Sequence, residues 1–279
     1  MFWQTTRHRI ALTRPLVMGI VNVTPDSFFD GGKFVESRAA IAHCDRLVAE
    51  GADLLDIGGE STRPGAARLS AQEELTRVLP ILRHALTLSL PVSVDTSSPT
   101  VMQSALDLGV DIINDVRALR SPGALEVVSR HGQAGLCLMH MLGEPGLMQA
   151  APTYGDVVVE VRSFLAARLQ AAQLAGIDAV RIVLDPGIGF GKTAMHNLQL
   201  LHRQHELASL GRPLLVGWSR KSTLGVITGR AVEERLAASV AAALAAVQRG
   251  ASIVRVHDVA ATVDALKIWR SAERGDMAQ

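Results

Sequence analysis

Aromatic residues and cysteines are both scarce in this chain of 279 residues. Aromatic residues make up 4% of the sequence, so the core must be built mainly from alanine, valine, leucine and isoleucine. Such a composition suits parallel strands that are buried on both faces. The two cysteines, Cys44 and Cys137, lie far apart and form no metal-binding or redox motif. The composition therefore favours an α/β protein with an aliphatic core.

The sequence also lacks a strong charge and a long apolar run. The formal net charge is +1 and no basic block is present, which gives no reason to expect nucleic acid or an anionic membrane as a partner. No apolar run approaches the roughly 18 residues that suggest a membrane span. The N-terminal residues, MFWQTTRHRI, lack the apolar stretch of a signal peptide. We therefore expect a soluble protein in the reducing environment of the cytoplasm.

Segments typical of strands and of helices alternate along the chain at intervals of about 30 residues, the length of one βα unit. The expected strands are 16–22, 53–57, 92–95, 111–114, 135–139, 181–185, 213–217 and 252–256. The expected helices are 37–50, 70–87, 99–108, 122–131, 156–175, 194–208, 233–249 and 259–271. No linker or low-complexity segment interrupts the series. Eight βα units predict an α/β fold, a single (β/α)8 TIM barrel over residues 1–279 with its core at about 15–271.

Several of the expected helices begin with residues that favour a helix start. Ser70 and Glu73 have the spacing of a capping box, in which the two side chains satisfy each other's backbone N–H groups. Pro99 and Pro122 each follow a serine, as expected for proline in the first helical turn. These signals support the helix positions independently of the apolar pattern.

Polar residues lie at or just past the ends of the expected strands. They are Asn22, Asp56, Asp95, Asn114, His140, Asp185, Ser219 and His257. One such residue could simply cap the following helix, but capping alone explains eight of them poorly. In a TIM barrel the carboxyl ends of the strands carry the active site. We therefore expect the active site at this end.

Two segments carry groups that bind anions. The segment 58–65, GGESTRPG, offers backbone N–H groups, hydroxyls and a guanidinium. Arg255 and His257 are two residues apart and share one face of the last strand. TIM barrels often bind phosphate at the loops after strands seven and eight, so these residues suit a phosphorylated substrate. A surface salt bridge remains the alternative for either residue taken alone.

The run 185–193, DPGIGFGKT, resembles a nucleotide-binding P-loop only in part. A P-loop requires glycine at the position that Pro186 occupies, and proline removes a backbone donor that such a loop would use. Nucleotide binding is therefore not expected here. The alternative is that the glycines allow a flat ligand to lie against the backbone.

Eight motifs in order resemble the bacterial dihydropteroate synthase family. They are GIVNVTPDSF, DIGGESTRPGA, VSVDTS, IINDV, CLMHM, DPGIGFGK, VGWSRKS and RVHDV, and they extend from Met18 to about Val259. The resemblance implies that 6-hydroxymethyl-7,8-dihydropterin pyrophosphate reacts with p-aminobenzoate to give 7,8-dihydropteroate and pyrophosphate. It also implies an SN1-like displacement, a Mg²⁺ cofactor, inhibition by sulfonamides and a homodimer. Asp95, Lys221 and Arg255 would be the catalytic residues.

The resemblance also assigns the binding residues. The pterin site would contain Asp95, Asn114, Met139, Asp185, Gly189, Gly217 and Lys221. The pyrophosphate site would contain Asn22, Thr62, Arg63, Arg255 and His257, with Asn22 as the Mg²⁺ ligand. The site for p-aminobenzoate or a sulfonamide would contain Phe28, Pro64, Phe190 and Ser219. A buried carboxylate such as Asp185 suits the guanidine-like edge of a pterin, because it accepts two adjacent N–H donors.

Two other functions are compatible with such a barrel. A pterin-dependent methyltransferase would lack the pyrophosphate-binding group of Arg63, Arg255 and His257 and would need a cobalamin partner. A catalytically inactive barrel could serve as a folate-binding or scaffolding protein. Loss of Asn22, Asp95 or Lys221 would indicate the inactive barrel, and all three residues are present.

Overall fold

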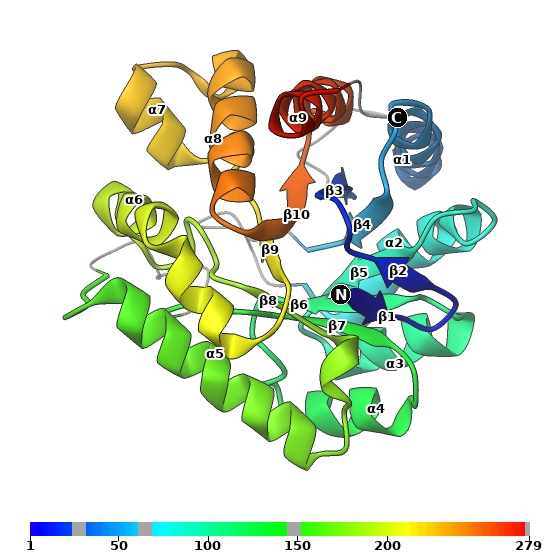
Figure 1. The fold of residues 1–279 in the computed structure, drawn as a ribbon. Helices are drawn as coiled ribbons and strands as arrows, with labels where there is room; N and C mark the ends of the chain where they lie inside the picture. The colour runs from blue at the N-terminus through cyan, green and yellow to red at the C-terminus, as the bar shows by residue number, and fades with distance from the viewer. Residues whose placement is uncertain (24–31, 61–68, 144–151, 277–279) are drawn as a thin grey trace.

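The computed structural model describes residues 1–23, 32–60, 69–143 and 152–276. Eight parallel strands close into a barrel in the order β10-β3-β4-β5-β6-β7-β8-β9 (Figure 1). They are β3 Leu16–Asn22, β4 Leu54–Gly58, β5 Val92–Asp95, β6 Ile112–Asp115, β7 Gly135–Met139, β8 Ile182–Asp185, β9 Leu214–Val216 and β10 Ala251–Val256. Each predicted strand agrees with an observed one to within one residue at either end. The predicted (β/α)8 TIM barrel is confirmed.

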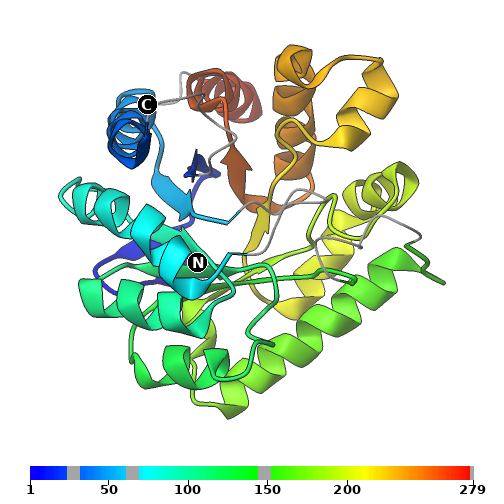
Figure 2. The same cartoon turned by 180° about the vertical axis from the view of Figure 1, so that it is seen from behind.

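Helices surround the barrel, as the two opposite views show (Figures 1 and 2). The helices are α1 Gly32–Ala49, α2 Ala71–Ala85, α3 Pro99–Leu108, α4 Ala124–Arg130, α5 Val157–Leu174, α6 Ala194–His202, α7 Ser222–Thr228, α8 Leu236–Gln248 and α9 Val259–Arg274. Short 3-10 turns are η2 Ala179–Arg181, η3 Gln204–Leu210 and η4 Val232–Glu234. Within the described ranges, no helix combines the length and apolar character that a membrane crossing requires.

Some helix boundaries differ from the sequence-based prediction. Helix α4 begins at Ala124 and not at Pro122, because Gly123 adopts a left-handed conformation with φ 87° and breaks the helical path. The predicted helix 194–208 is divided into α6 and the turn η3. Helix α7 follows directly on Lys221 and was not predicted. The first turn of α3 does begin with Pro99, as expected.

A hairpin that was not predicted lies at the end of the barrel where the strands begin. It consists of β1 Phe2–Gln4 and β2 Arg9–Ala11 (Figure 1). The indole of Trp3 is fully buried among interior residues, and its Nε1 donates to the carbonyl oxygen of Arg181 at 2.8 Å. The hairpin therefore covers the end of the barrel opposite to the carboxyl ends of the strands.

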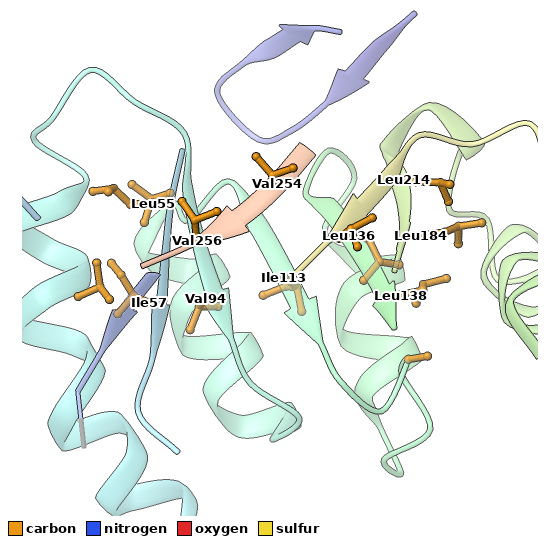
Figure 3. Close-up of a cluster of buried hydrophobic side chains, with 14 of the residues drawn as sticks. Leu55, Ile57, Val94, Ile113, Leu136, Leu138, Leu184, Leu214, Val254 and Val256 are labelled. Atoms are coloured by element: carbon orange, nitrogen blue, oxygen red, sulfur yellow. The ribbon is translucent and has the colours of Figure 1, made fainter. Parts of the chain in front are cut away.

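Successive side chains along each strand point to opposite sides of the barrel wall and so form two apolar layers. Leu55, Ile57 and other outward residues pack between the barrel and the helices (Figure 3). Leu54, Met18 and other inward residues fill the barrel interior. Each strand therefore reads as a nearly continuous buried run. Polar residues at inward positions must lie inside the barrel or at its mouth, and this geometry places the site.

We predict that Ser70→Ala lowers the free energy of unfolding by about 1 kcal/mol. The hydroxyl of Ser70 accepts from the backbone N–H of Glu73 at 3.2 Å, and the Glu73 carboxylate accepts from the backbone N–H of Ser70 at 2.9 Å. The capping box is thus confirmed, and the substitution removes half of it. Urea unfolding measures the loss. Thr76→Ala in the same helix is the control and should show no decrease.

Candidate active site

The strand register brings the predicted polar residues together at the carboxyl end of the barrel. Asp95 of β5 lies beside Gly58 of β4 and Asn114 of β6, and Asp185 of β8 lies beside Met139 of β7. These residues occupy inward positions, because they alternate with the outward residues of the same strands. The side chains from separate strands therefore converge on one centre.

Arg255 of β10 is held by two carboxylates inside this centre. Its Nε donates to Oδ2 of Asp56 at 2.6 Å, and its Nη2 donates to Oδ2 of Asp95 at 2.9 Å. The Nδ2 of Asn114 also donates to Oδ2 of Asp56, at 3.1 Å. Asp56 is fully buried and lies in the middle of β4. The sequence placed Asp56 at the rim and missed its role as the partner of Arg255.

Burial shifts the pKa values of three ionisable groups of the centre toward 7. It raises the pKa of Asp95 to about 7, although the Arg255 guanidinium opposes this effect. Burial also raises the pKa of Asp185 to about 6, against a hydrogen bond from the backbone N–H of Gly187. The pKa of Lys221 falls to about 8 for the same reason. Perturbed groups that converge in this way are typical of a functional site.

His257 and Ser219 form a pair at the mouth. The backbone N–H of His257 donates to Oγ of Ser219 at 3.2 Å, and Oγ lies 3.0 Å from Nδ1 of His257. The hydroxyl of Ser219 therefore contacts both the backbone and the ring of His257. Burial and then Arg255 lower the pKa of His257 to about 3, so the ring is neutral. A neutral His257 offers an anion one ring N–H donor at most and no positive charge.

The turn 187–191 follows β8 and is rich in glycine. Gly187, Gly189 and Gly191 have φ values of 68°, 81° and 63°, which a residue with a Cβ adopts only with strain. A Cβ on Gly187 would collide with the backbone carbonyl of His140, and one on Gly191 with that of Leu142. Two of these glycines thus allow close approach of the turn to the backbone of His140 and Leu142, whereas the contact with a flat ligand stays a prediction. Gly189 faces Lys221.

Phe190 projects from this turn toward the pterin-site residues. It packs against Val116, Met139 and Met141, and its ring lies 4.3 Å from the ammonium of Lys221. The contact is within the range of a cation–π interaction. Phe190 therefore joins the predicted p-aminobenzoate residues to the predicted pterin residues.

Other predicted residues fall outside this centre or outside the description. His140 faces helix α5, where its ring meets Phe164 edge-on at 4.9 Å, so it does not reach the mouth as expected. Asn22 ends β3 and is exposed. Phe28, Thr62, Arg63 and Pro64 lie outside the described residues. The sequence also missed Lys192, which is buried beneath the turn.

Comparison with known proteins agrees with the barrel fold. A family model described as "Pterin binding enzyme" matches residues 18–257. The chain belongs to the pterin-binding enzyme family. Among its relatives in that family, the dihydropteroate synthase of Neisseria meningitidis is 53% identical over 275 residues, covering 96% of both chains. The dihydropteroate synthase of Escherichia coli K12 is 46% identical and covers 92% of this chain and 91% of its own length.

Solved structures of the same family superpose closely. A Xanthomonas albilineans dihydropteroate synthase with 4-aminobenzoic acid is 54% identical, with a TM-score of 0.90 and 95% coverage of both chains. A Yersinia pestis dihydropteroate synthase in a sulfonamide complex is 44% identical, with a TM-score of 0.93 and coverage of 98% of this chain and 100% of that one. At these identities the likeness extends beyond the fold.

We predict that one aspartate carboxyl titrates near pH 7 and that Asp56→Asn moves this titration to lower pH. Removal of the neighbouring negative charge favours the ionised form of Asp95. Because the folded-state pKa lies above the ordinary 3.8, Asp95 ionises at lower pH in the unfolded chain than in the folded one, and the free energy of unfolding therefore falls as the pH rises from about 4 to about 7.

Carbon-13 NMR of labelled aspartates measures this titration. Asp95→Asn should remove the signal and so assign it. Asp53→Asn, which removes the surface partner of Arg14, is the control and should leave the titration unchanged. A titration that stays in place in Asp56→Asn would contradict the proposed coupling.

Proposed function

We propose that the residues around Arg255 form the substrate site of a dihydropteroate synthase. The chain condenses 6-hydroxymethyl-7,8-dihydropterin pyrophosphate with p-aminobenzoate and releases pyrophosphate. The observation that carries this function is 53% identity over 96% of both chains with a dihydropteroate synthase, on a barrel that keeps the polar residues at its mouth. The alternatives, an inactive folate-binding barrel or a pterin-dependent methyltransferase, gain no support from these relatives.

The pterin ring would be bound by residues whose orientation is already fixed. Asp185 accepts from the backbone N–H of Gly187 at 2.7 Å through Oδ1, which orients its carboxylate toward adjacent N–H donors of the ring. Asn114 donates through Nδ2 to Asp56, so its carbonyl oxygen can accept from a ring N–H. Lys221 would donate to the ring acceptors. These three residues together match a guanidine-like edge and its neighbours.

The remaining pterin residues would shape the pocket. Met139 lies in the small apolar cluster with Phe190, and a flexible thioether suits the face of a flat ring. Gly189 and Gly217 carry no side chain, and a Cβ on Gly217 would approach Arg255 to 3.9 Å. Their backbones therefore leave room for a ring beside the charged centre.

The reaction itself would need no nucleophilic side chain. The bond from the pterin methylene carbon to the pyrophosphate oxygen breaks, and the oxygen keeps the electron pair. The amino group of p-aminobenzoate then forms the new C–N bond and loses a proton to solvent. Asp95 would stabilise the cationic pterin. This is catalysis by charge stabilisation and alignment, in which fixed groups replace reorganising water.

Arg255 would bind the leaving pyrophosphate through one guanidinium nitrogen. Its Nε and Nη2 contact Asp56 and Asp95, while Nη1 forms no hydrogen bond to the described part of the chain. We assign Nη1 and the ring of His257 to the pyrophosphate, together with Thr62 and Arg63. The p-aminobenzoate or sulfonamide site would be bordered by Phe28, Pro64, Phe190 and Ser219.

Mg²⁺ would enter with the substrate. Across the described ranges no group of three or more His, Cys, Asp or Glu residues could hold a metal ion. Asn22 offers one neutral oxygen at the exposed end of β3, which fits an ion that takes most ligands from phosphate and water. When bound, Mg²⁺ would neutralise charge on the pyrophosphate. The cytoplasmic location stays a prediction, which cell fractionation tests.

We predict that the purified chain releases pyrophosphate only when the pterin pyrophosphate, p-aminobenzoate and Mg²⁺ are all present. Asp185→Asn and Lys221→Ala should weaken pterin binding by about 2–5 kcal/mol, because each leaves a buried charged partner unpaired. A coupled pyrophosphate assay and calorimetry measure the two effects. A folded chain without turnover would contradict the activity, and unchanged pterin affinity would contradict the assigned residues.

We further propose a homodimer through one apolar face. Helix α7 packs against both α6 and α8 (Figures 1 and 2). These helices and η4 carry exposed apolar side chains: Met195, Leu198, Val226, Ile227, Val232 and Leu236. Contiguous exposed apolar surface is typical of a protein–protein interface, whereas scattered apolar residues are not. A second copy of the chain is the partner that the family resemblance implies.

We predict that Val226→Glu with Ile227→Glu converts the dimer to a monomer, because two charges would be buried at the interface. Light scattering coupled to gel filtration measures the mass. Ile268→Glu on α9 is the matched control, since Ile268 and Val226 are both 73% exposed. A monomeric parent chain, or a dimer that survives the double substitution, would refute this interface.

A further inference from the structure

Lys192 is buried directly beneath the turn 187–191. Its Nζ lies 2.8 Å from the carbonyl oxygen of Gly187, 3.0 Å from that of Phe190 and 2.9 Å from Nδ1 of His140. The carbonyl oxygen of His140 lies farther away, at 3.4 Å. An ammonium group has three N–H donors and no acceptor, so the three nearer acceptors use its full capacity. One side chain therefore binds both ends of the turn and the end of strand β7.

The His140 side of this contact is fixed by the charge state of the ring. Burial and then Lys192 lower the pKa of His140 to about 3, so the imidazole is neutral and Nδ1 can accept a hydrogen bond. Burial also lowers the pKa of Lys192 to about 7, while Asp185 opposes this effect. Deprotonation of Lys192 would remove one of three donors, so the contacts themselves favour the ammonium form.

Burial of the Lys192 ammonium is unfavourable for the stability of the fold. Lys192 is 3% exposed and forms no ion pair with any described residue. A buried cation without a carboxylate contact depends on its hydrogen bonds and on the more distant charge of Asp185, and an apolar side chain of similar length often stabilises such a position better. A requirement for geometry explains why a lysine lies here.

The turn that Lys192 holds carries groups from both predicted substrate sites. The backbone N–H of Gly187 orients Asp185, and the ring of Phe190 lies against Lys221 and Met139. The hydroxyl of Tyr154 donates to the carbonyl oxygen of Gly191 at 2.8 Å and so fixes the next residue of the turn. Within the turn, the backbone N–H of Phe190 also donates to the carbonyl oxygen of Gly187 at 3.1 Å.

We propose that Lys192 is a positioning residue that fixes the ring of Phe190 as a wall for p-aminobenzoate. Without the ammonium, the carbonyl groups of Gly187 and Phe190 lose their shared partner, and the glycine-rich turn can relax. The backbone of Asp185 is held in strand β8, and only its hydrogen bond from Gly187 depends on the turn, whereas Phe190 lies at the far end of the turn. The effect should therefore fall mainly on p-aminobenzoate. This inference rests on the proposed p-aminobenzoate site at Phe190.

Steady-state kinetics of Lys192→Met tests the proposal. We expect the KM for p-aminobenzoate to rise on the order of tenfold or more, because small misplacement of an aligning group has large kinetic effects. The affinity for the pterin substrate should change less. Lys267→Met, at an exposed position on α9, is the matched control and should change neither value. An equal loss for both substrates, or no loss, would overturn the proposal.

A double-mutant cycle separates positioning from general stability. If Lys192 acts through Phe190, then Lys192→Met should add little to the KM change that Phe190→Ala already causes. Additive effects would mean that Lys192 acts by another route. If Lys192→Met does not fold, Lys192→Gln carries the same tests, because its amide keeps two donors and should give a smaller change in the same direction.

Failure of the underlying site is distinguishable from failure of this inference. An unchanged KM for p-aminobenzoate in Phe190→Ala would refute the assignment of Phe190, and the role of Lys192 would fall with it. A raised KM in Phe190→Ala, together with an unchanged KM in Lys192→Met or Lys192→Gln, would keep the site and refute the role of Lys192.

Discussion

Inside the closed barrel the guanidinium of Arg255 lies between the carboxylates of Asp56 and Asp95, and the other charged groups are arranged around this contact. The interior solvates charge poorly, so each of these groups depends on the others. Removal of one partner from such a buried pair commonly costs about 3–5 kcal/mol, because the remaining charge is left uncompensated. The barrel wall supplies the rigidity that keeps the three side chains in register.

The poor solvation of charge also explains why several groups at the mouth have pKa values near 7. Burial moves the pKa values of Asp95, Asp185 and Lys221 toward 7 from both sides. Such buried groups contribute more binding free energy to a ligand with complementary hydrogen bonds than groups solvated by water do, because their water has been removed in advance. The same burial lowers the stability of the empty fold, a cost that is typical of functional sites.

The loops after β8 and β9 carry the groups that strands alone cannot supply. Arg220 adopts a left-handed conformation with φ 60°, and its backbone N–H donates to Oγ of Ser239 at 2.9 Å, which helps to present Lys221 at the start of α7. The turn 187–191 presents Phe190 from the neighbouring strand. The contact between Lys221 and Phe190 joins these two loops, so the position of one affects the other.

The barrel and the polar residues at its mouth can be predicted from the amino-acid sequence. Strand positions followed from short apolar runs, and the polar residues at their ends had to meet because parallel strands end at one face. Which of these residues are partners is known only from the folded chain. Asp56 and His140 are both polar residues near the end of an expected strand, yet the side chain of Asp56 points inward to Arg255 and that of His140 points outward to α5. The hairpin before β3, the charge state of His257 and the role of Lys192 also depend on burial and on contacts between distant segments, which local patterns do not encode.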